Sequence, residues 1–457
     1  SVYPKGYTNT NDFLGLRWVV AKGIALENFP LEIKKRKTWL DKIDIKDDER
    51  FDWCCRYGHD DIAALMVRSH LVEHSNLWKS MTPLYTAARF DCVNAAKALV
   101  DAGADLEATS MDLTNKRTTA LFVAAGRGNV RVLNYLLKAG AYPEVLREDG
   151  GTPLHVACQR GHYKCVGALL DAGVDVIDKT HRSDGEDDNL ATIERAFGPG
   201  ARVEEIEESK AHRRAGSALH VAAQKGHVEI VKILCEHTRE LQWSGVVSQT
   251  AFKGWVNDAR PCTPLYLACQ QGKAMVAQIL IRHGADINAR TLAELGGGTP
   301  LFVAIQYNRV HVVKRLLECG ADPNQPNALD ATPLFIAAVT GHTATFKALL
   351  DYGACLKKRS KGGVNPFFIA AQYGNLDIIK EIARVFGHQR EDFWTTDDKT
   401  TPMMIACFTG QFEVVQWLIQ QKHDVFAKNI HGLSPSFAAR KSGNAKVIQL
   451  ITDKCQL

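Results

Sequence analysis

Histidine and cysteine are the side chains in this sequence whose types could support metal binding or nucleophilic catalysis. Such chemistry needs several of these groups together, and its usual sequence signature is a short spacing such as CxxC or HExxH. Neither spacing occurs, because the twelve cysteines are scattered and many histidines recur at long intervals. We therefore predict no metal site, no cofactor site and no catalytic residue. The recurring histidines are His59, His155, His162, His220, His227 and His342.

Three consecutive glycines, Gly296 to Gly298, are the nearest approach to a phosphate-binding loop. A phosphate loop follows a buried strand and carries a GK[ST] ending, and this run has neither. No nucleophile elbow and no kinase signature is present. Acidic pairs fall in polar stretches, where solvation is their ordinary state. These absences argue against an enzyme.

The regular spacing comes from a repeated phrase. Its clearest copy is TPLHVAC at Thr152 to Cys158, followed by Gly161. Most steps between copies are 33 to 37 residues, and the two exceptions are a step of 65 after Thr152 and one of 46 after Ser217. The copies begin at residues 49, 82, 119, 152, 217, 263, 299, 332, 365, 401 and 434.

Each copy predicts a helix, a turn and a second helix. Threonine is a good N-cap, and proline is tolerated at the first helical position because its missing N–H had no partner there. A small pair such as Ala222-Ala223 lets neighbouring helices approach closely. The glycine that follows, as at Gly226, can take the left-handed conformation that ends a helix. Apolar spacing from Val228 to Leu234 then predicts the second helix.

The TPLHxA phrase on a 33-residue period resembles the ankyrin-repeat family over residues 47–457. The resemblance implies an all-α fold, an α-solenoid with short β-hairpin tips and about eleven repeats. Stacking of neighbouring units would supply the core. The family pattern implies local hydrogen bonds for the recurring histidines. It also implies buried, inert thiols in the small-residue slot, which holds Cys54, Cys55, Cys158, Cys269 and Cys407.

The breaks in the period predict the domain organisation. Residues 1–48 lie outside the pattern, and we expect a helical cap that covers the first repeat. Repeats 1–4 occupy 49–178, and repeats 5–11 occupy 216–457. Between them, 179–215 is expected to be an acidic insertion. A smaller insertion is expected around 240–259.

Several features outside the repeat phrase have two interpretations. Residues 179–215 nearly equal one period, so a decayed repeat is the alternative to an insertion. Trp243 and Trp255, with Phe252, form either a small satellite core or an exposed anchor. The basic run from Lys34 to Lys37 is interpreted as a solvated helix face, with a nuclear-import or phosphate-contact patch as the alternative. A start without methionine indicates a processed terminus, a trimmed chain or a fragment.

In ankyrin arrays the two variable residues before the turn glycine face a concave groove, and the resemblance carries that role to these positions. The first five repeats each place a cation there, and later repeats offer glutamine, tyrosine and phenylalanine, which are common at protein interfaces. We therefore expect an acidic segment to favour the N-terminal repeats. The predicted partner-binding residues are Arg56, Tyr57, Arg89, Phe90, Arg127, Arg160, Lys225, Gln306, Tyr307, Gln372, Tyr373 and Phe408.

Composition is consistent with a protein-interaction scaffold or adaptor. The 457 residues are 46% hydrophobic and 23% charged with a net charge of +5, which is too weak to call for nucleic acid or a membrane surface. No apolar run is long enough to insert into a bilayer. Scattered cysteines favour a reducing compartment, the cytoplasm or nucleus. We expect a monomer that binds a protein or peptide. The alternative is the ankyrin portion of a larger channel, kinase or ubiquitin-ligase receptor.

Overall fold

The computed structural model describes residues 47–68, 72, 81–111, 117–147, 151–174, 176, 218–240, 262–291, 297–386 and 395–455. The chain divides into two compact units, and each is described by itself. Unit 1 comprises residues 1–124 and 129–142, and unit 2 comprises residues 125–128 and 143–457.

Several predicted features fall largely or wholly outside the described residues. They are the N-terminal cap with Lys34 to Lys37, the segment 179–215, and the insertion around 240–259 with its two tryptophans and Phe252. The first described helix begins at Asp47, so the predicted boundary at residue 48 falls inside that helix.

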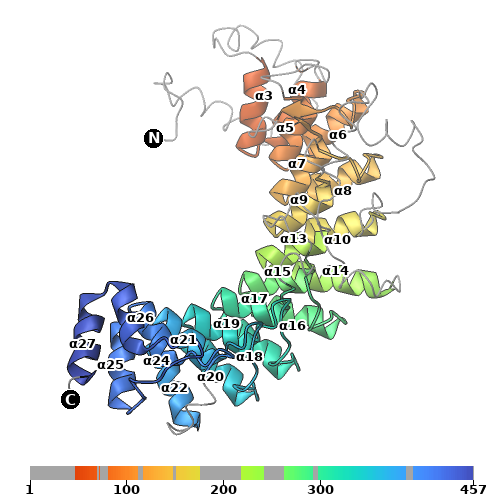
Figure 1. Ribbon diagram of the computed structural model, residues 1–457. Coiled ribbons are helices and arrows are strands. Elements are labelled where there is room, and N and C mark those ends of the chain that lie inside the picture. The colour runs from red at the N-terminus through yellow and green to blue at the C-terminus, as the bar shows by residue number, and fades with distance from the viewer. Residues whose placement is uncertain are drawn as a thin grey trace, which may run out of the picture. The chain divides into compact units, whose positions relative to one another are not determined.

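The described residues form helix pairs, one pair for each copy of the repeated phrase, which confirms the predicted all-α repeat fold (Figure 1). The first helix of a pair is short, and the second follows after a tight turn. The pairs are α3 (Asp47–Arg56) and α4 (Asp60–Arg68), α5 (Pro83–Arg89) and α6 (Val93–Asp101), α7 (Ala120–Arg127) and α8 (Val130–Lys138), α9 (Pro153–Arg160) and α10 (Tyr163–Asp171), α13 (Ala218–Lys225) and α14 (Val228–Glu240), α15 (Pro264–Gln270) and α16 (Ala274–Arg282), α17 (Pro300–Gln306) and α18 (Val310–Glu318), α19 (Pro333–Thr340) and α20 (Thr343–Asp351), α21 (Pro366–Tyr373) and α22 (Leu376–Phe386), α24 (Pro402–Phe408) and α25 (Phe412–Gln420), and α26 (Pro435–Ser442) and α27 (Ala445–Cys455).

Hydroxyl or amide side chains cap many of the first helices, as the sequence predicts. Thr332 Oγ1 accepts a hydrogen bond from the backbone N–H of Phe335, and Pro333 takes the first helical position. Asn365 caps α21 in the same way through the N–H of Phe368. The cap accepts from an N–H that has no partner within the helix, so the short first helix begins at a fixed residue.

The turn after the first helix requires a left-handed residue. Gly341 has φ of 75° and ends α19, as the sequence predicts for the turn glycine. In two repeats the same position is not glycine: Asp91 has φ of 60° and Asn308 has φ of 53°. Aspartate and asparagine tolerate this conformation better than most other residues, so the turn is kept without glycine.

The residue after the turn often bridges neighbouring repeats. Its side chain hydrogen-bonds to carbonyl groups at the end of the first helix of the previous repeat. These carbonyls have no hydrogen-bond partner inside their own helix. Asn129 Nδ2 donates to the carbonyl of Ala88 at 2.8 Å, within unit 1. In unit 2, Asn375 Nδ2 donates to the carbonyl of Ala338 at 2.6 Å. These hydrogen bonds add a polar contribution to the stability of the interface between neighbouring repeats.

The repeats pack through two rows of helices in unit 2. First helices contact first helices from α9 to α26, and second helices contact second helices from α10 to α22. The small pair of the phrase is buried where the first helices meet, as at Ala337 and Ala338, both 0% exposed. One hairpin in unit 1 pairs as antiparallel strands, β1 (Ser110–Met111) with β2 (Arg117–Thr118). No helix in the described part of the chain is long and apolar enough to cross a membrane.

Candidate functional site

The predicted partner-binding residues lie at or just after the ends of first helices, and the structure divides them between the units. Arg56, Tyr57, Arg89 and Phe90 belong to unit 1, and the others belong to unit 2. Three of the set are half-buried: Arg89, Phe90 and Gln372. The exposed members are Arg56, Tyr57, Arg127, Arg160, Lys225, Gln306, Tyr307, Tyr373 and Phe408.

Unit 2 carries three exposed rings at these positions, which we call the aromatic row: Tyr307, Tyr373 and Phe408. Their exposed fractions are 47%, 54% and 56%. The row follows the stack of first helices α17, α19, α21 and α24, in which neighbours pack directly against each other. Helix α19 interrupts the row, because it presents Val339 and Thr340 at the equivalent positions.

Glutamine side chains at the equivalent positions do not all reach solvent. Gln270 is 8% exposed, and its Nε2 donates to the hydroxyl of Tyr307 at 3.4 Å. Gln224 is also 8% exposed. Gln372 is half-buried, and its backbone carbonyl accepts from Gln411 Nε2 at 3.2 Å. The amide groups therefore brace the first helices in part, and the three rings of the aromatic row remain exposed.

Sequence reasoning missed Phe437 as a surface residue. In the last described repeat it occupies the position that His155 occupies in the phrase TPLHVAC. Histidines at this position are buried at His155 and His220, which are 4% and 1% exposed. Phe437 is 46% exposed, and Lys441 Nζ lies 6.0 Å from the centre of its ring. The ring is exposed because α26 is the last first helix of the structure, so no further described repeat covers this slot. No feature of the phrase itself could have signalled this exposure.

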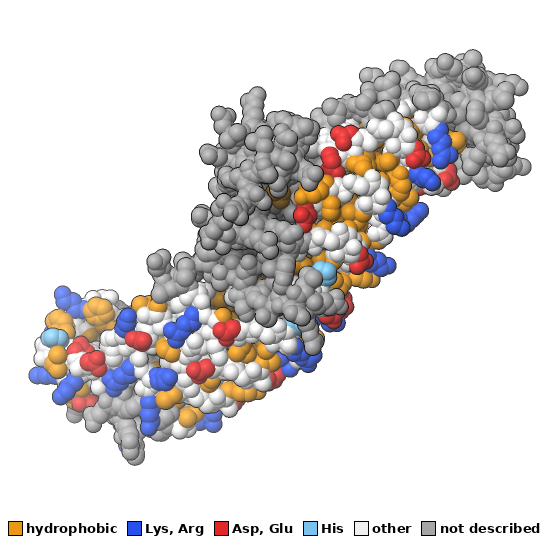
Figure 2. All heavy atoms as spheres, turned by 90° about the vertical axis from the view of Figure 1, so that its right-hand side faces the viewer, with side chains coloured by type: hydrophobic (Ala, Val, Ile, Leu, Met, Phe, Trp, Pro, Cys, Tyr) orange, Lys and Arg blue, Asp and Glu red, His pale blue; other side chains and the backbone are white. Residues whose placement is uncertain are grey.

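Three basic residues of unit 2 lie at the ends of first helices. Arg127, Arg160 and Lys225 end α7, α9 and α13 and are exposed. On the face that Figure 2 shows, lysine and arginine side chains alternate with aspartate and glutamate side chains over the described part of unit 2. Exposed charges in such a mixture act mainly on association rate and salt dependence.

The recurring histidines make local bonds. His162 Nε2 lies 3.2 Å from the carbonyl of Gly126, and His227 Nε2 lies 3.3 Å from that of Gln159. His342 Nδ1 lies 2.9 Å from the carbonyl of Ile305. Burial lowers the pKa of His162, so its neutral form is favoured. No cluster of metal-binding side chains occurs among the described residues.

The cysteines of the small-residue slot are buried. Cys158, Cys269 and Cys407 are each 0% exposed. Burial raises the pKa of the Cys158 and Cys269 thiols. It also raises that of Cys54, to about 12. A thiol with a raised pKa carries little of the reactive thiolate, so these groups are poor nucleophiles.

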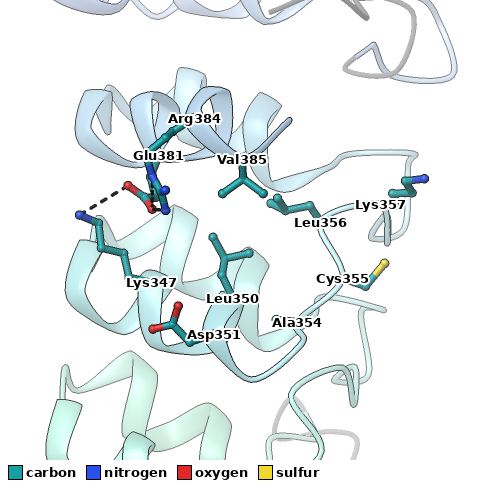
Figure 3. A pocket seen from close by; sticks show the side chains of 10 residues that line it. All are labelled: Lys347, Leu350, Asp351, Ala354, Cys355, Leu356, Lys357, Glu381, Arg384 and Val385. Carbon is teal, nitrogen blue, oxygen red and sulfur yellow. Dashed lines mark hydrogen bonds and ion pairs between the residues drawn. The ribbon is translucent and has the colours of Figure 1, made fainter. Parts of the chain in front are cut away.

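A cavity of about 330 Å³ lies between α20 and α22, on second helices rather than on the predicted binding positions (Figure 3). Its polar wall is an ion-pair cluster around Glu381, whose side chain is 8% exposed. Arg384 Nη2 lies 2.6 Å and Lys347 Nζ 3.5 Å from the carboxylate oxygens of Glu381. The hydrogen bond from Arg384 lowers the pKa of Glu381. The cluster joins two neighbouring repeats, which gives it a structural role.

Ankyrin-repeat models match more than half of the chain, so the chain belongs to the ankyrin-repeat family. Ankyrin repeats are protein-interaction modules, and protein binding is the function that membership assigns. The three-copy model matches residues 107–180, 188–291, 247–327 and 301–387, and the single-repeat model matches residues 79–111 and 398–430.

Curated relatives share the repeats over part of their length. "Ankyrin repeat and KH domain-containing protein mask-1" of Caenorhabditis elegans is 28% identical over 49% of this chain and 8% of that protein. "NF-kappa-B inhibitor cactus" of Drosophila melanogaster is 30% identical over 35% of this chain and 29% of its own length. "E3 ubiquitin-protein ligase XB3" of Oryza sativa subsp. japonica is 28% identical over 45% of this chain and 38% of its own length.

Among solved structures, the human ASB11 ankyrin repeat domain is similar to this chain. The similarity covers 55% of this chain and 92% of that one, with 27% sequence identity and a TM-score of 0.40. The chain thus spans well under two thirds of the curated relatives that it matches.

Proposed function

We propose that this chain is a scaffold or adaptor that binds an extended segment of a partner protein along the ends of its first helices. The observation that carries the proposal is the aromatic row. Tyr307, Tyr373 and Phe408 are each about half exposed on helices that stack in one row. Rings on a rigid scaffold supply contact area at low entropic cost, and tyrosine is among the residues that dominate binding energy at interfaces.

An acidic partner segment fits the basic positions of the first five repeats. Arg127, Arg160 and Lys225 are exposed at the ends of successive first helices in unit 2, and Arg56 is exposed in unit 1. Complementary charge accelerates association and adds salt dependence. A nucleic-acid partner is less well supported, because a net charge of +5 over 457 residues is modest.

Catalysis is no part of the proposed function. His162 and His227 lie within hydrogen-bond distance of backbone carbonyls of neighbouring repeats, and burial raises the pKa of the Cys158 thiol. We place the chain in a reducing compartment, the cytoplasm or nucleus, because its twelve cysteines are scattered and form no CxxC pair. We also propose that it is a monomer by itself.

A second candidate is that these repeats form the ankyrin portion of a longer protein. The relatives favour it, because the matched segments cover between 8% and 38% of their lengths. Their names include a KH domain-containing protein and an E3 ubiquitin-protein ligase. Sequencing the complete transcript tests this candidate. A reading frame that adds a further domain supports it, and one that ends with these repeats contradicts it.

A peptide-display experiment tests the binding surface. A random-peptide phage library is selected against the whole chain, and the enriched peptides are synthesised. We expect the Tyr373→Ala, Phe408→Ala double variant to bind them at least about tenfold more weakly, since a buried aromatic anchor contributes on the order of 2 kcal/mol. Tyr352→Ala is the matched control, because Tyr352 is 44% exposed but follows a second helix. Equal losses in both variants would contradict the proposed surface.

A further inference from the structure

Two arginines from adjacent repeats of unit 1 lie against one phenylalanine ring. Arg56 is the last residue of α3 and Arg89 is the last residue of α5. Their guanidinium carbons lie 5.8 Å and 5.4 Å from the centre of the Phe90 ring. Both distances are within the range of cation–π contact. Two positive groups are thus held close to the same half-buried ring.

The donors of Arg89 are poorly satisfied. Its Nε is buried and has no hydrogen-bond partner among the described residues. Its Nη1 lies 3.8 Å from the sulfur of Met81, which is a weak acceptor. Arg56 differs, because its Nη2 pairs with Asp52 Oδ2 at 2.7 Å. A guanidinium without strong acceptors forgoes the charge-assisted hydrogen bonds that it forms best.

Asp60 of α4 and Asp91 of the turn after α5 have other partners. Asp60 accepts hydrogen bonds from the N–H groups of Asn94 and Ala95, at 3.0 Å and 2.8 Å. Asp91 accepts from the N–H of Val132 at 3.2 Å. These carboxylates serve the starts of α6 and α8. Within the described residues no carboxylate lies within ion-pair distance of Arg89, so its charge has no counterpart there.

We propose that Arg89, assisted by Arg56, binds a carboxylate side chain of an acidic partner peptide. The planar guanidinium matches a carboxylate in shape and can offer it two parallel N–H donors. Tyr57 follows Arg56 directly and is 47% exposed, so a ring is available for the apolar part of the same peptide. This inference rests on the proposed function and assigns a chemical specificity to the first-helix ends of unit 1.

The surroundings of Arg89 and Arg56 imply that the two arginines contribute unequally to binding of the carboxylate. Arg56 already forms an ion pair with Asp52, and its side chain is 54% exposed. Water therefore screens the attraction between Arg56 and a peptide carboxylate. Arg89 is half-buried and sits on the ring, where a carboxylate would be partly desolvated. Charge-assisted hydrogen bonds are stronger in such surroundings. We therefore expect Arg89 to dominate the recognition.

The peptides selected against the whole chain provide the test. We expect one enriched family to contain aspartate or glutamate at a fixed position, and Arg89→Gln to weaken binding of its members at least about tenfold. Arg89→Lys should restore only part of the loss, because lysine keeps the charge but not the planar donors. Arg131→Gln, an exposed charge on α8 of the same unit, should change affinity less than about twofold. The thermal midpoint of each variant shows whether it is folded.

Substituted peptides distinguish a carboxylate from other anions. The fixed acidic residue is replaced by glutamine or asparagine in one peptide and by phosphoserine in another. A loss of affinity on amide replacement supports the inference. Tighter binding of the phosphopeptide to the wild-type chain overturns it, because the site would then recognise phosphate rather than a carboxylate. Enriched peptides without a fixed acidic residue, or with affinity unchanged by Arg89→Gln, overturn it and leave the proposed function standing. A library that yields no binding peptide contradicts both.

Discussion

Replacing Asn375 with alanine tests whether polar bridges couple neighbouring repeats. Asn375 follows the turn after α21, and its Nδ2 donates to the carbonyls of Ala338 and Val339, at 2.6 Å and 3.2 Å. Both carbonyls lie in the last turn of α19, so the side chain joins α19 to the repeat of α21. Alanine at this position leaves two part-buried acceptors without this donor.

The expected cost is about 2 kcal/mol, at about 1 kcal/mol net for each hydrogen bond. Stability in a repeat array is close to a sum of repeat terms and neighbour terms, so the loss should fall on one interface. The repeats from α21 to α27 are then held less firmly by those before them. Their opening equilibrium should rise by about 30-fold, since each 1.4 kcal/mol is a factor of ten.

Hydrogen exchange followed by mass spectrometry measures this local opening. We expect faster exchange in α21 to α27 and unchanged exchange in α9 to α16. Gln416→Ala is the control, because it removes an exposed amide side chain from α25 in the same unit. Acceleration spread evenly over unit 2, or none in α21 to α27, would refute the coupling that we assign to Asn375.

Two further predictions concern ionisable groups. Glu381→Gln should lower the free energy of unfolding by about 1 kcal/mol at neutral pH, since Arg384 is 72% exposed and screened by water. In the folded chain the pKa of Glu381 lies below its ordinary 4.5. The difference in free energy of unfolding between wild type and variant should therefore persist above pH 4.5 and disappear as pH falls through the folded pKa. Urea unfolding at several pH values measures this difference. Cys355 is half-buried and Cys158 is fully buried, so iodoacetamide should label Cys355 first in the native chain, and equal rates by mass spectrometry would contradict the burial.

The sequence predicted the local geometry of the repeats well because each element depends on residues close together in the chain. The cap of Thr332 and the left-handed turn of Gly341 both follow from neighbouring residues. The turns at Asp91 and Asn308 show that the same geometry survives without glycine. The bridge from Asn375 could not be predicted, because its acceptors belong to the preceding repeat and meet it only after stacking.

Exposure at the candidate site was harder to predict than its position. The positions just before the turn hold exposed rings at Tyr307 and Tyr373. The same slot holds Gln270, which is 8% exposed because its side chain lies against the next repeat. The unsatisfied Nε of Arg89 depends on packing around Phe90, and the exposure of Phe437 depends on which repeat follows it. Neither property can be predicted from the position of the residue in the repeated phrase.

The central claim is that a partner segment covers the ends of the first helices. Carbene footprinting of the whole chain, with and without a peptide selected by display, tests it most directly, because the reagent labels exposed side chains. We predict protection of Tyr373 and Phe408 and unchanged labelling of Tyr163 and Met275, which are exposed on second helices. Protection of Tyr163 or Met275, with Tyr373 and Phe408 still labelled, would contradict the account.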